Sequence, residues 1–220
     1  VHINLFLCSV AFNGRSFPLF WLLLSKRGCS SLENQQALLT PVLQALASHP
    51  ILSSLPTKVV ADREFCSPLL ARWLTEQGIH VCIRIKQQYR VSRSDFPSIP
   101  IRRFLEHCQR GTYCFYEQIL LTDDHQFPVN LLIAWRSDCE EPIAILSDLE
   151  EARAVEASYQ ERPFIETLNR DLTSSGFDIE RGRMTDSTRL SNFLIPMAFA
   201  YILAVIQGYT EDILQPIPPS

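Results

Sequence analysis

Tyr159, Arg162 and Glu166 are spaced so that a single helix would carry all three side chains on one face. Offsets of three and seven residues correspond to rotations of about 300° and 700°, at roughly 100° per residue. An arginine one turn from a carboxylate keeps it ionised and oriented, and the guanidinium can bind a phosphate through two hydrogen bonds. A surface ion pair between Arg162 and Glu166, worth roughly 0.3 kcal/mol, explains the same spacing. The spacing alone therefore leaves phosphate chemistry and a solvated helix face as alternatives.

Asp62 directly follows a short apolar segment, in VVADREF. Ligand sites of open α/β sheets lie where a strand ends and the next loop opens a crevice. A carboxylate in that place is a suitable ligand for a hard cation such as Mg²⁺. Capping of a following helix by Asp62 fits equally well. Arg63 and Glu64 could orient Asp62 or simply begin that helix.

Composition limits how the chain could bind nucleic acid. It has 220 residues, 20 Lys and Arg against 24 Asp and Glu, and a formal net charge of -4, which excludes a small, uniformly basic binder. DNA contact would have to come from a local patch. One stretch contains Lys86, Arg90, Arg93, Arg102 and Arg103 against the single acidic residue Asp95. This stretch predicts either contact with DNA phosphates or a solvated loop.

The first 85 residues predict the elements that would position Asp62. Two strands, 3–12 and 17–25, flank the turn residues Asn13, Gly14 and Arg15, which are typical of a hairpin. Further elements are predicted at 31–48 (helix), 58–61 (strand), 68–77 (helix) and 80–85 (strand). Antiparallel strands followed by alternating helices and strands indicate an α/β fold, a mixed sheet flanked by helices.

The second half predicts strands at 112–121, 127–135 and 142–146, within an all-β insertion over residues 87–147. Helical sequence follows from 149 to about 174, interrupted by Pro163, and a last helix is expected at 189–207. The apolar run 193–206 is shorter than the roughly 20 residues a bilayer requires, so we expect a buried helix rather than a membrane span. Residues 211–220 are predicted to be a flexible tail. The seven scattered cysteines lack C-x-x-C spacing, so they are predicted to be small buried hydrophobes in a reducing, cytoplasmic compartment.

The chain resembles the DDE transposases of bacterial insertion sequences, in the insertion sequence four group with the YREK signature. The segments that carry this resemblance are VVADREF, the β insertion and YQERPFIETLNRDLTSSGFDIERGRMTD. The resemblance extends over residues 1 to about 208. It implies an RNase H-like catalytic domain, over residues 1–210, in which two Asp and one Glu hold two Mg²⁺ ions, for which Mn²⁺ can substitute. By this resemblance, Asp62 is the second acidic ligand and Glu166 is the third.

The resemblance also assigns DNA contacts. Tyr159 and Arg162 match the first two signature residues, which hold DNA phosphates near the cut. Thr173 stands where the signature has a lysine, with Arg170 on a nearby turn. Pro163 stands where the family usually has an aromatic residue, and we expect this proline to kink or restart the helix. Lys86, Arg90 and Arg93 are expected to contact further phosphates. The implied partners are double-stranded DNA, at transposon ends and at the target, and a second copy in a homodimer on DNA. The implied location is the bacterial cytoplasm, at the nucleoid, without a membrane.

One expected feature is absent from the sequence. The family's first aspartate lies on a central strand before the segment that corresponds to residues 3–12, and no acidic residue precedes Glu33. We therefore expect a transposase truncated at its N-terminus, with the first central strand missing between the strands 3–12 and 58–61. The function that the resemblance implies is metal-dependent DNA strand cleavage and strand transfer. Because the first aspartate is missing, we expect this fragment to be inactive. The alternative is a non-catalytic, DNA-binding or dimer-poisoning remnant that occupies transposon ends without cutting.

Overall fold

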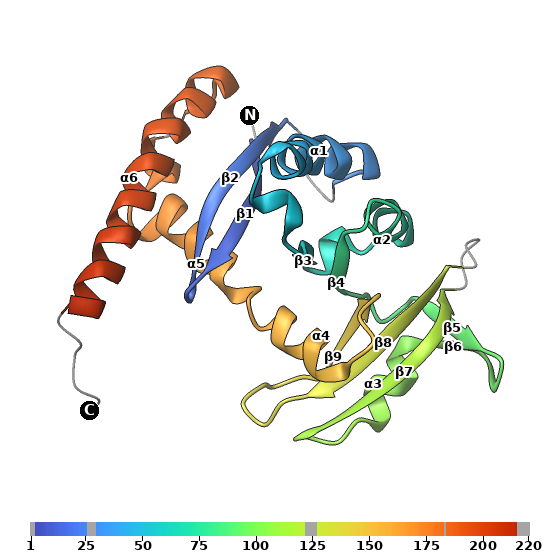
Figure 1. Cartoon of the computed structure of the whole chain (residues 1–220). Coiled ribbons are helices and arrows are strands. Elements are labelled where there is room, and N and C mark those ends of the chain that lie inside the picture. The colour runs from blue at the N-terminus through green and yellow to red at the C-terminus, as the bar shows by residue number, and fades with distance from the viewer. Residues whose placement is uncertain (1–2, 26–29, 122–126, 183, 215–220) are drawn as a thin grey trace. The chain divides into compact units, whose positions relative to one another are not determined.

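The computed structural model of the chain describes residues 3–25, 30–121, 127–182 and 184–214 (Figure 1). Two units can be distinguished by their internal contacts. The terminal unit contains residues 1–28, 38–42 and 163–220, and the central unit contains residues 29–37 and 43–162. Helix α1, Leu32–Ser48, contributes residues to both units. Helix α1 begins one residue later than predicted, after Ser31, whose side chain accepts a hydrogen bond from the backbone of Asn34 in a capping box.

A hairpin of two antiparallel strands, β1 (Asn4–Phe12) and β2 (Arg15–Leu24), forms the sheet of the terminal unit. Asn13 and Gly14 make the turn with φ values of 45° and 78°. Both values lie in the left-handed region that a two-residue type I′ turn requires, and Asn-Gly is the sequence that best tolerates it. The hairpin predicted from this dipeptide is confirmed.

Helices α5 (Pro163–Arg170) and α6 (Ser187–Leu214) complete the terminal unit, with a π-helical turn at Asp171–Ser175 and a 3₁₀ turn at Ile179–Gly182. The buried cluster of this unit joins Leu7 of β1, Leu168 of α5 and Met197 of α6, together with Leu172 and Tyr201. The indole N–H of Trp21 donates to the hydroxyl of Ser191 at 3.1 Å, which ties β2 to α6.

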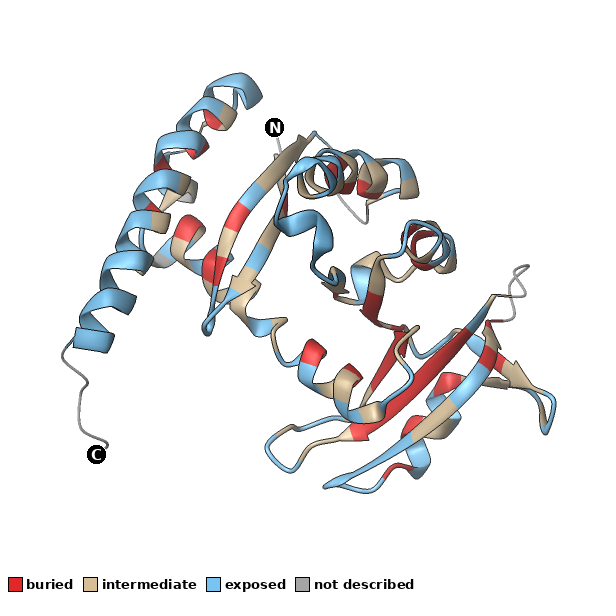
Figure 2. Ribbon diagram, in the orientation of Figure 1, coloured by how far each residue is buried: buried red, intermediate tan, exposed pale blue. Residues whose placement is uncertain are grey.

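The observed α6 differs from the predicted helix in length and in exposure. It begins at Ser187 and ends at Leu214, so residues 211–214 of the predicted tail are helical, and residues 215–220 lie outside the described part of the chain. Only one face is buried, through Leu190, Leu194, Met197 and Tyr201, and Figure 2 shows the rest of the helix as mostly exposed. The prediction of a buried helix is therefore wrong outside that face.

By length and composition, α6 passes the test for a membrane-crossing helix. Its most apolar 18-residue window has a mean hydropathy of 1.7, and 22% of that window is buried. A single helix of this kind is weak evidence for a membrane span, because helices that pack in soluble proteins pass the same test.

The central unit is built on a seven-stranded mixed sheet with the order β3-β4-β9-β8-β7-β5-β6. Its strands are β3 (Lys58–Ala61), β4 (His80–Arg84), β5 (Arg90–Arg93), β6 (Phe96–Pro100), β7 (Thr112–Leu121), β8 (Pro128–Trp135) and β9 (Ile143–Ser147). Strand β3 is parallel to β4, and the other paired strands are antiparallel. Strand β8 is buried from Val129 to Ala134 and forms the red band in Figure 2.

Helices α2 (Pro68–Thr75), α3 (Ile101–His107) and α4 (Ala152–Tyr159) complete the central unit. Val155 of α4 packs against Cys82, Leu132 and Ile145, which lie on one face of the sheet. The α/β class and the mixed sheet flanked by helices are therefore confirmed. Strands β1 and β3, between which a central strand was expected, belong to different sheets and are not paired with each other.

The insertion is not all-β. It includes α3, whose Ile101 and Leu105 are buried, and its last strand, β9, pairs directly with β4. This helix is missed in the sequence because Arg102 and Arg103 give it the composition of a basic loop. The three strands predicted at 112–121, 127–135 and 142–146 are present within one residue of their expected ends. The centre of the predicted β7–β8 turn, residues 122–126, lies outside the described residues.

Candidate functional site

Asp62 lies immediately after β3, at the carboxyl end of a parallel strand pair. One carboxylate oxygen, Oδ1, accepts the backbone N–H of Arg63 at 2.7 Å and caps the 3₁₀ turn Arg63–Phe65. The capping interpretation is therefore right for this turn, whereas the following helix α2 is capped by Ser67. The capping contact does not exclude a second role for Asp62. The other oxygen, Oδ2, accepts a hydrogen bond from Nη2 of Arg162, also at 2.7 Å.

Arg162 reaches Asp62 from the end of the α4 segment, 100 residues later in the sequence. Helix α4 ends at Tyr159, and the chain continues as a tighter turn in which Arg162 N–H donates to the Tyr159 carbonyl at 3.1 Å. Pro163 has no N–H, so this series of backbone bonds stops there and α5 starts afresh. The expectation that Pro163 restarts the helix is confirmed. The side chains of Arg162 and Asp62 are 21% and 25% exposed, so solvent screens this ion pair only in part.

A second contact fixes the same turn against the other end of β3. Nζ of Lys58, the first residue of β3, donates to the Ser158 hydroxyl at 3.1 Å and lies 3.9 Å from a carboxylate oxygen of Glu161. The ring of Tyr159 is half-buried and packs against the apolar cluster between α4 and the sheet. Tyr159 therefore anchors the turn from which Arg162 extends.

The three residues of the spaced motif do not share one continuous helix. Tyr159 ends α4 in the central unit, whereas Glu166 lies in the first turn of α5 in the terminal unit. The rotation of about 100° per residue, which placed the three on one face, therefore does not hold through residues 160–162. Glu166 and Arg170 are both exposed on α5. Thr173, at the position of the signature lysine, lies in the π-helical turn, where its hydroxyl donates to the Asn169 carbonyl.

Hard oxygen ligands for a divalent cation are available at Asp62 and Glu166. Carboxylates are the ligands that Mg²⁺ and Mn²⁺ prefer, so the donor chemistry fits the implied metal. Within the described part of the chain, no three His, Cys, Asp or Glu residues are grouped as a metal site. The residues present thus fit a metal in kind, and a complete site needs at least one more ligand.

The basic residues predicted to contact DNA have different surroundings. Arg93 makes two hydrogen bonds of 2.6 Å to the carboxylate of Asp95 and lies 5.2 Å from the ring centroid of Phe96. This carboxylate raises the pKa of Arg93, and the guanidinium in turn lowers the pKa of Asp95. Arg90 donates to the hydroxyl and the carbonyl of Ser98. A phosphate would have to compete with these contacts at both arginines.

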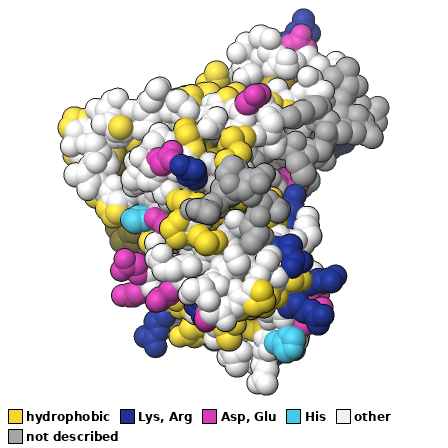
Figure 3. Space-filling view, turned by 90° about the vertical axis from the view of Figure 1, so that its right-hand side faces the viewer, with side chains coloured by type: hydrophobic (Ala, Val, Ile, Leu, Met, Phe, Trp, Pro, Cys, Tyr) yellow, Lys and Arg dark blue, Asp and Glu magenta, His cyan; other side chains and the backbone are white. Residues whose placement is uncertain are grey.

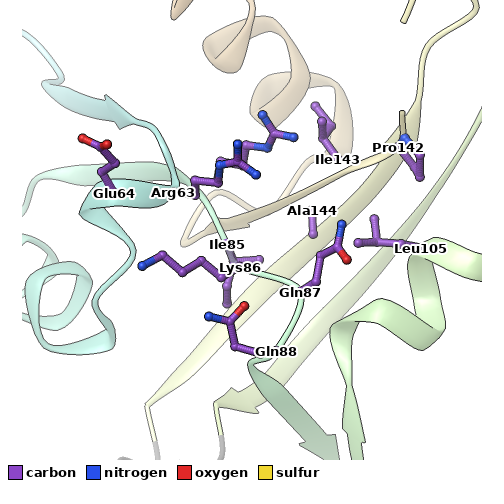
Figure 4. Close-up of a pocket in the computed structure, with 11 residues that line it drawn as sticks. Arg63, Glu64, Ile85, Lys86, Gln87, Gln88, Leu105, Pro142, Ile143 and Ala144 are labelled. Carbon is purple, nitrogen blue, oxygen red and sulfur yellow. The ribbon is translucent and has the colours of Figure 1, made fainter. Parts of the chain in front are cut away.

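Lys86 instead lines a hollow of about 530 Å³ at the end of β4 (Figure 4). Two further cations, Arg63 and Arg84, line the same hollow. In Figure 3, Lys and Arg side chains gather at the lower right of the molecule, and Asp and Glu side chains lie mostly at the left. The sequence analysis considered Arg63 only as a support for Asp62 or as part of a helix start, and Arg84 only as the beginning of the basic stretch. A usable signal existed in their nearness to strand ends, since Arg84 is the last residue of β4 and Arg63 lies two residues after β3 ends.

A comparison with protein families decides the identity. Residues 4–203 match the family described as Transposase DDE domain. The chain belongs to this family. No curated protein is similar enough to this transposase domain to count as a relative.

Family membership gives the domain its general function, DNA transposition, and its partner, DNA. The family also depends on divalent metal ions, which agrees with the carboxylate chemistry of Asp62 and Glu166. The resemblance to DDE transposases, inferred from VVADREF and the segment after Tyr159, is confirmed at this level. The assignment to the YREK group and the truncation stay predictions.

Proposed function

We propose that this domain is of the insertion sequence four type and carries out metal-dependent DNA strand cleavage and strand transfer at transposon ends. Asp62 and Glu166 would be its metal ligands, with Mg²⁺ as the ion and Mn²⁺ as a substitute. The observation that carries the proposal is the 2.7 Å contact between Arg162 and Asp62. Two residues selected separately, one from VVADREF and one from the spaced motif, meet at the carboxyl end of β3.

In this proposal Arg162 has two tasks. It orients the Asp62 carboxylate before DNA binds, and its planar guanidinium binds a phosphate oxygen of the strand to be cut. A divalent ion held by Asp62 and Glu166 would supply Lewis-acid chemistry at the scissile phosphate. Tyr159 positions the turn, and Arg170 provides positive charge close to Glu166 on α5. The work of the protein would take place in the bacterial cytoplasm, on duplex DNA at the nucleoid, as a homodimer.

Plasmid nicking tests this function. The purified chain and the variants Asp62→Asn and Glu166→Gln would each be incubated with supercoiled plasmid and Mg²⁺ or Mn²⁺. The metal concentration would be on the order of 5 mM, enough to saturate a weak carboxylate site. We expect only weak nicking that needs the metal, because no third ligand is grouped with Asp62 or Glu166 among the described residues, and its loss in either variant, because each change removes a charged metal ligand. A Glu140→Gln variant, which removes an exposed carboxylate in the loop between β8 and β9, is the matched control and should keep its activity.

A second function is favoured by the lack of a three-ligand group among the described residues. In this alternative the chain binds DNA without cutting it and occupies transposon ends. It predicts no nicking with either metal, and DNA binding that Arg162→Ala weakens and Asp62→Asn does not. Nicking that survives in Asp62→Asn would contradict the catalytic proposal, and binding without nicking would establish the alternative.

A further inference from the structure

Two long cationic side chains connect β3 with the segment 158–162 at the end of α4, and they extend in opposite directions. Nη2 of Arg162 extends from the segment to Asp62, immediately after β3. Nζ of Lys58 extends from the first residue of β3 to the hydroxyl of Ser158, in the last turn of α4. All four residues belong to the central unit. The proposed function uses only the contact of Arg162, so the contact of Lys58 needs its own explanation.

Lys58 donates to a buried oxygen. Ser158 is 3% exposed, and its hydroxyl donates to the Ala154 carbonyl at 2.7 Å. A hydroxyl has only one proton to donate, so the same oxygen accepts from the Lys58 ammonium at 3.1 Å. A charge-assisted hydrogen bond to a buried group is stronger than an exposed ion pair. The position of the Ser158 oxygen therefore determines where the Lys58 ammonium lies.

Lys58 has a second partner in Glu161, the residue before Arg162. One carboxylate oxygen of Glu161 lies 3.9 Å from Nζ, and the two side chains are 39% and 41% exposed, so this pair alone contributes little. Glu161 matters through its place, because its backbone N–H donates to the Ser158 carbonyl at 3.2 Å. Lys58 thus contacts the first and the fourth residue of the segment, and Arg162 is the fifth.

Strand β3 holds this segment at two separate points. The strand is a firm base, because its four residues pair in parallel register with β4. Lys58 and Asp62 are about 13 Å apart along an extended chain, whereas Ser158 and Arg162 are about 6 Å apart along a helical one. A segment held only through Arg162 could rotate about that contact. The contact of Lys58 opposes this rotation.

We propose that Lys58 is a positioning residue of this transposase domain. By holding Ser158 and Glu161, it keeps the guanidinium of Arg162 at the Asp62 carboxylate before DNA binds. Lys58 itself contacts neither DNA nor metal in this role. The proposal rests on the proposed function, because it takes Arg162 as a phosphate-binding residue and Asp62 as a metal ligand.

Two measurements on the full chain test this role. The first is NMR of nitrogen-labelled arginine side chains, in which the signal that Arg162→Ala removes is assigned to Arg162. The second is fluorescence anisotropy with a labelled blunt DNA duplex. Lys58→Met removes the ammonium and keeps an unbranched side chain, and Ser158→Ala removes the buried hydroxyl without changing any charge. Thermal unfolding of each variant shows that it is folded.

Arg136→Met is the matched control. The side chain of Arg136 is 39% exposed, as that of Lys58 is, and it is paired with Asp138 at 2.7 Å elsewhere in the central unit. Like Lys58→Met, it removes one positive charge and one polar contact. It should leave the signal of Arg162 and the affinity for the duplex unchanged.

We expect Arg162 to give a distinct signal in the unmodified chain, which moves toward the signals of exposed arginines in Lys58→Met and in Ser158→Ala. Arg162→Ala should weaken binding of the duplex about tenfold, the effect of one lost charge-assisted hydrogen bond. Lys58→Met should weaken it about threefold, half of that effect in free energy, because Tyr159 still anchors the segment. In a chain that already carries Arg162→Ala, Lys58→Met should have no further effect.

Three results would overturn the proposal. An unchanged signal of Arg162 in Lys58→Met and Ser158→Ala would show that Lys58 does not position it. Losses of affinity that add in the double variant would assign Lys58 to a phosphate contact of its own. A change of the Arg162 signal as large in Arg136→Met would mean that any lost cation has this effect. Failure of the unmodified chain to bind the duplex would reject the proposed function, and the NMR comparison would still decide whether Lys58 positions Arg162.

Discussion

Removal of the contact between Arg162 and Asp62 should cost more stability than removal of an exposed pair with the same chemistry. The guanidinium and the carboxylate are joined at 2.7 Å, and their side chains are 21% and 25% exposed. Charge-assisted hydrogen bonds contribute about 1.5–3 kcal/mol, and exposed ion pairs about 0.2–1 kcal/mol. A partly buried pair should lie between these ranges. We expect a coupling free energy of about 1–2 kcal/mol.

The chain offers a matched control in Arg72 and Glu76 on α2. They form the same kind of contact at 2.8 Å, but their side chains are 52% and 60% exposed. Exposed pairs at this helical spacing contribute about 0.3–0.5 kcal/mol. Burial is therefore the main physical difference between the two pairs.

A double-mutant cycle measures both couplings. Arg162→Ala, Asp62→Ala and the double variant would be unfolded in urea at pH 7, followed by circular dichroism and tryptophan fluorescence, beside the same three variants of Arg72 and Glu76. The loss of the cap at Asp62, about 1 kcal/mol, occurs in the single and in the double variant and so cancels from the coupling term. The cycle would be repeated in about 0.5 M NaCl, where the Debye length is shorter than the roughly 8 Å found at 0.15 M. This salt should remove most of the coupling between Arg72 and Glu76 and leave most of the coupling between Arg162 and Asp62.

The result that refutes this reasoning is a coupling between Arg162 and Asp62 no larger than that of the control pair. Loss of the coupling in salt would refute it as well, because partial burial should limit screening. Either outcome would mean that the contact does not hold Asp62 in place, and Arg162 would lose its proposed orienting task.

Three further predictions concern the turn, a half-buried thiol and DNA. Gly14→Ala should destabilise the terminal unit by about 1–2 kcal/mol, measured by thermal unfolding, because a side chain is disfavoured at φ +78° although no atom lies within 4 Å of the added carbon. Burial raises the pKa of the Cys8 thiol to about 11 from 9.0. The unfolded thiol ionises first as pH rises through 9, so Cys8 should lower the free energy of unfolding by roughly 2–3 kcal/mol between pH 9 and 11. Burial also raises the pKa of the Cys66 and Cys82 thiols, so Cys8→Ala should make the fall smaller without abolishing it. Arg162→Ala should weaken DNA binding and nicking together, and nicking at full rate in that variant would exclude its phosphate-binding role.

Local signals explain which parts of the fold could be predicted from the sequence. Asn13 and Gly14 allow a turn that few other residue pairs adopt, so the first hairpin follows from two residues. Ser31 and Pro50 mark the ends of α1 in the same way. Strand β8 is recognised because a nearly continuous apolar run in a short segment is typical of a strand covered on both faces.

The elements that were missed depend on partners distant in sequence. Helix α3 is seven residues long, and it is stabilised by the burial of Ile101 and Leu105 rather than by its own propensity. The hollow at the end of β4 depends on the pairing of β9 with β4 across some 60 residues, which brings Ala144 beside Ile85. No pattern within a short window contains that pairing. Likewise, the sequence identified Asp62 and Arg162 as candidates but did not indicate that they would bind each other.

Pro163 explains why the spaced motif was only partly interpreted correctly. It breaks the backbone hydrogen bonds after Arg162, so the residues on its two sides are positioned by different cores. Arg162 depends on Val155 and Tyr159, which pack on the seven-stranded sheet, and Glu166 depends on Leu168, which packs with Leu7 and Met197. Arg162 and Glu166 are therefore each positioned by their own unit. A cavity made in one core should displace the residue that this core supports, because packing contacts and hydrogen bonds determine the position of each side chain more strongly than spacing along the sequence.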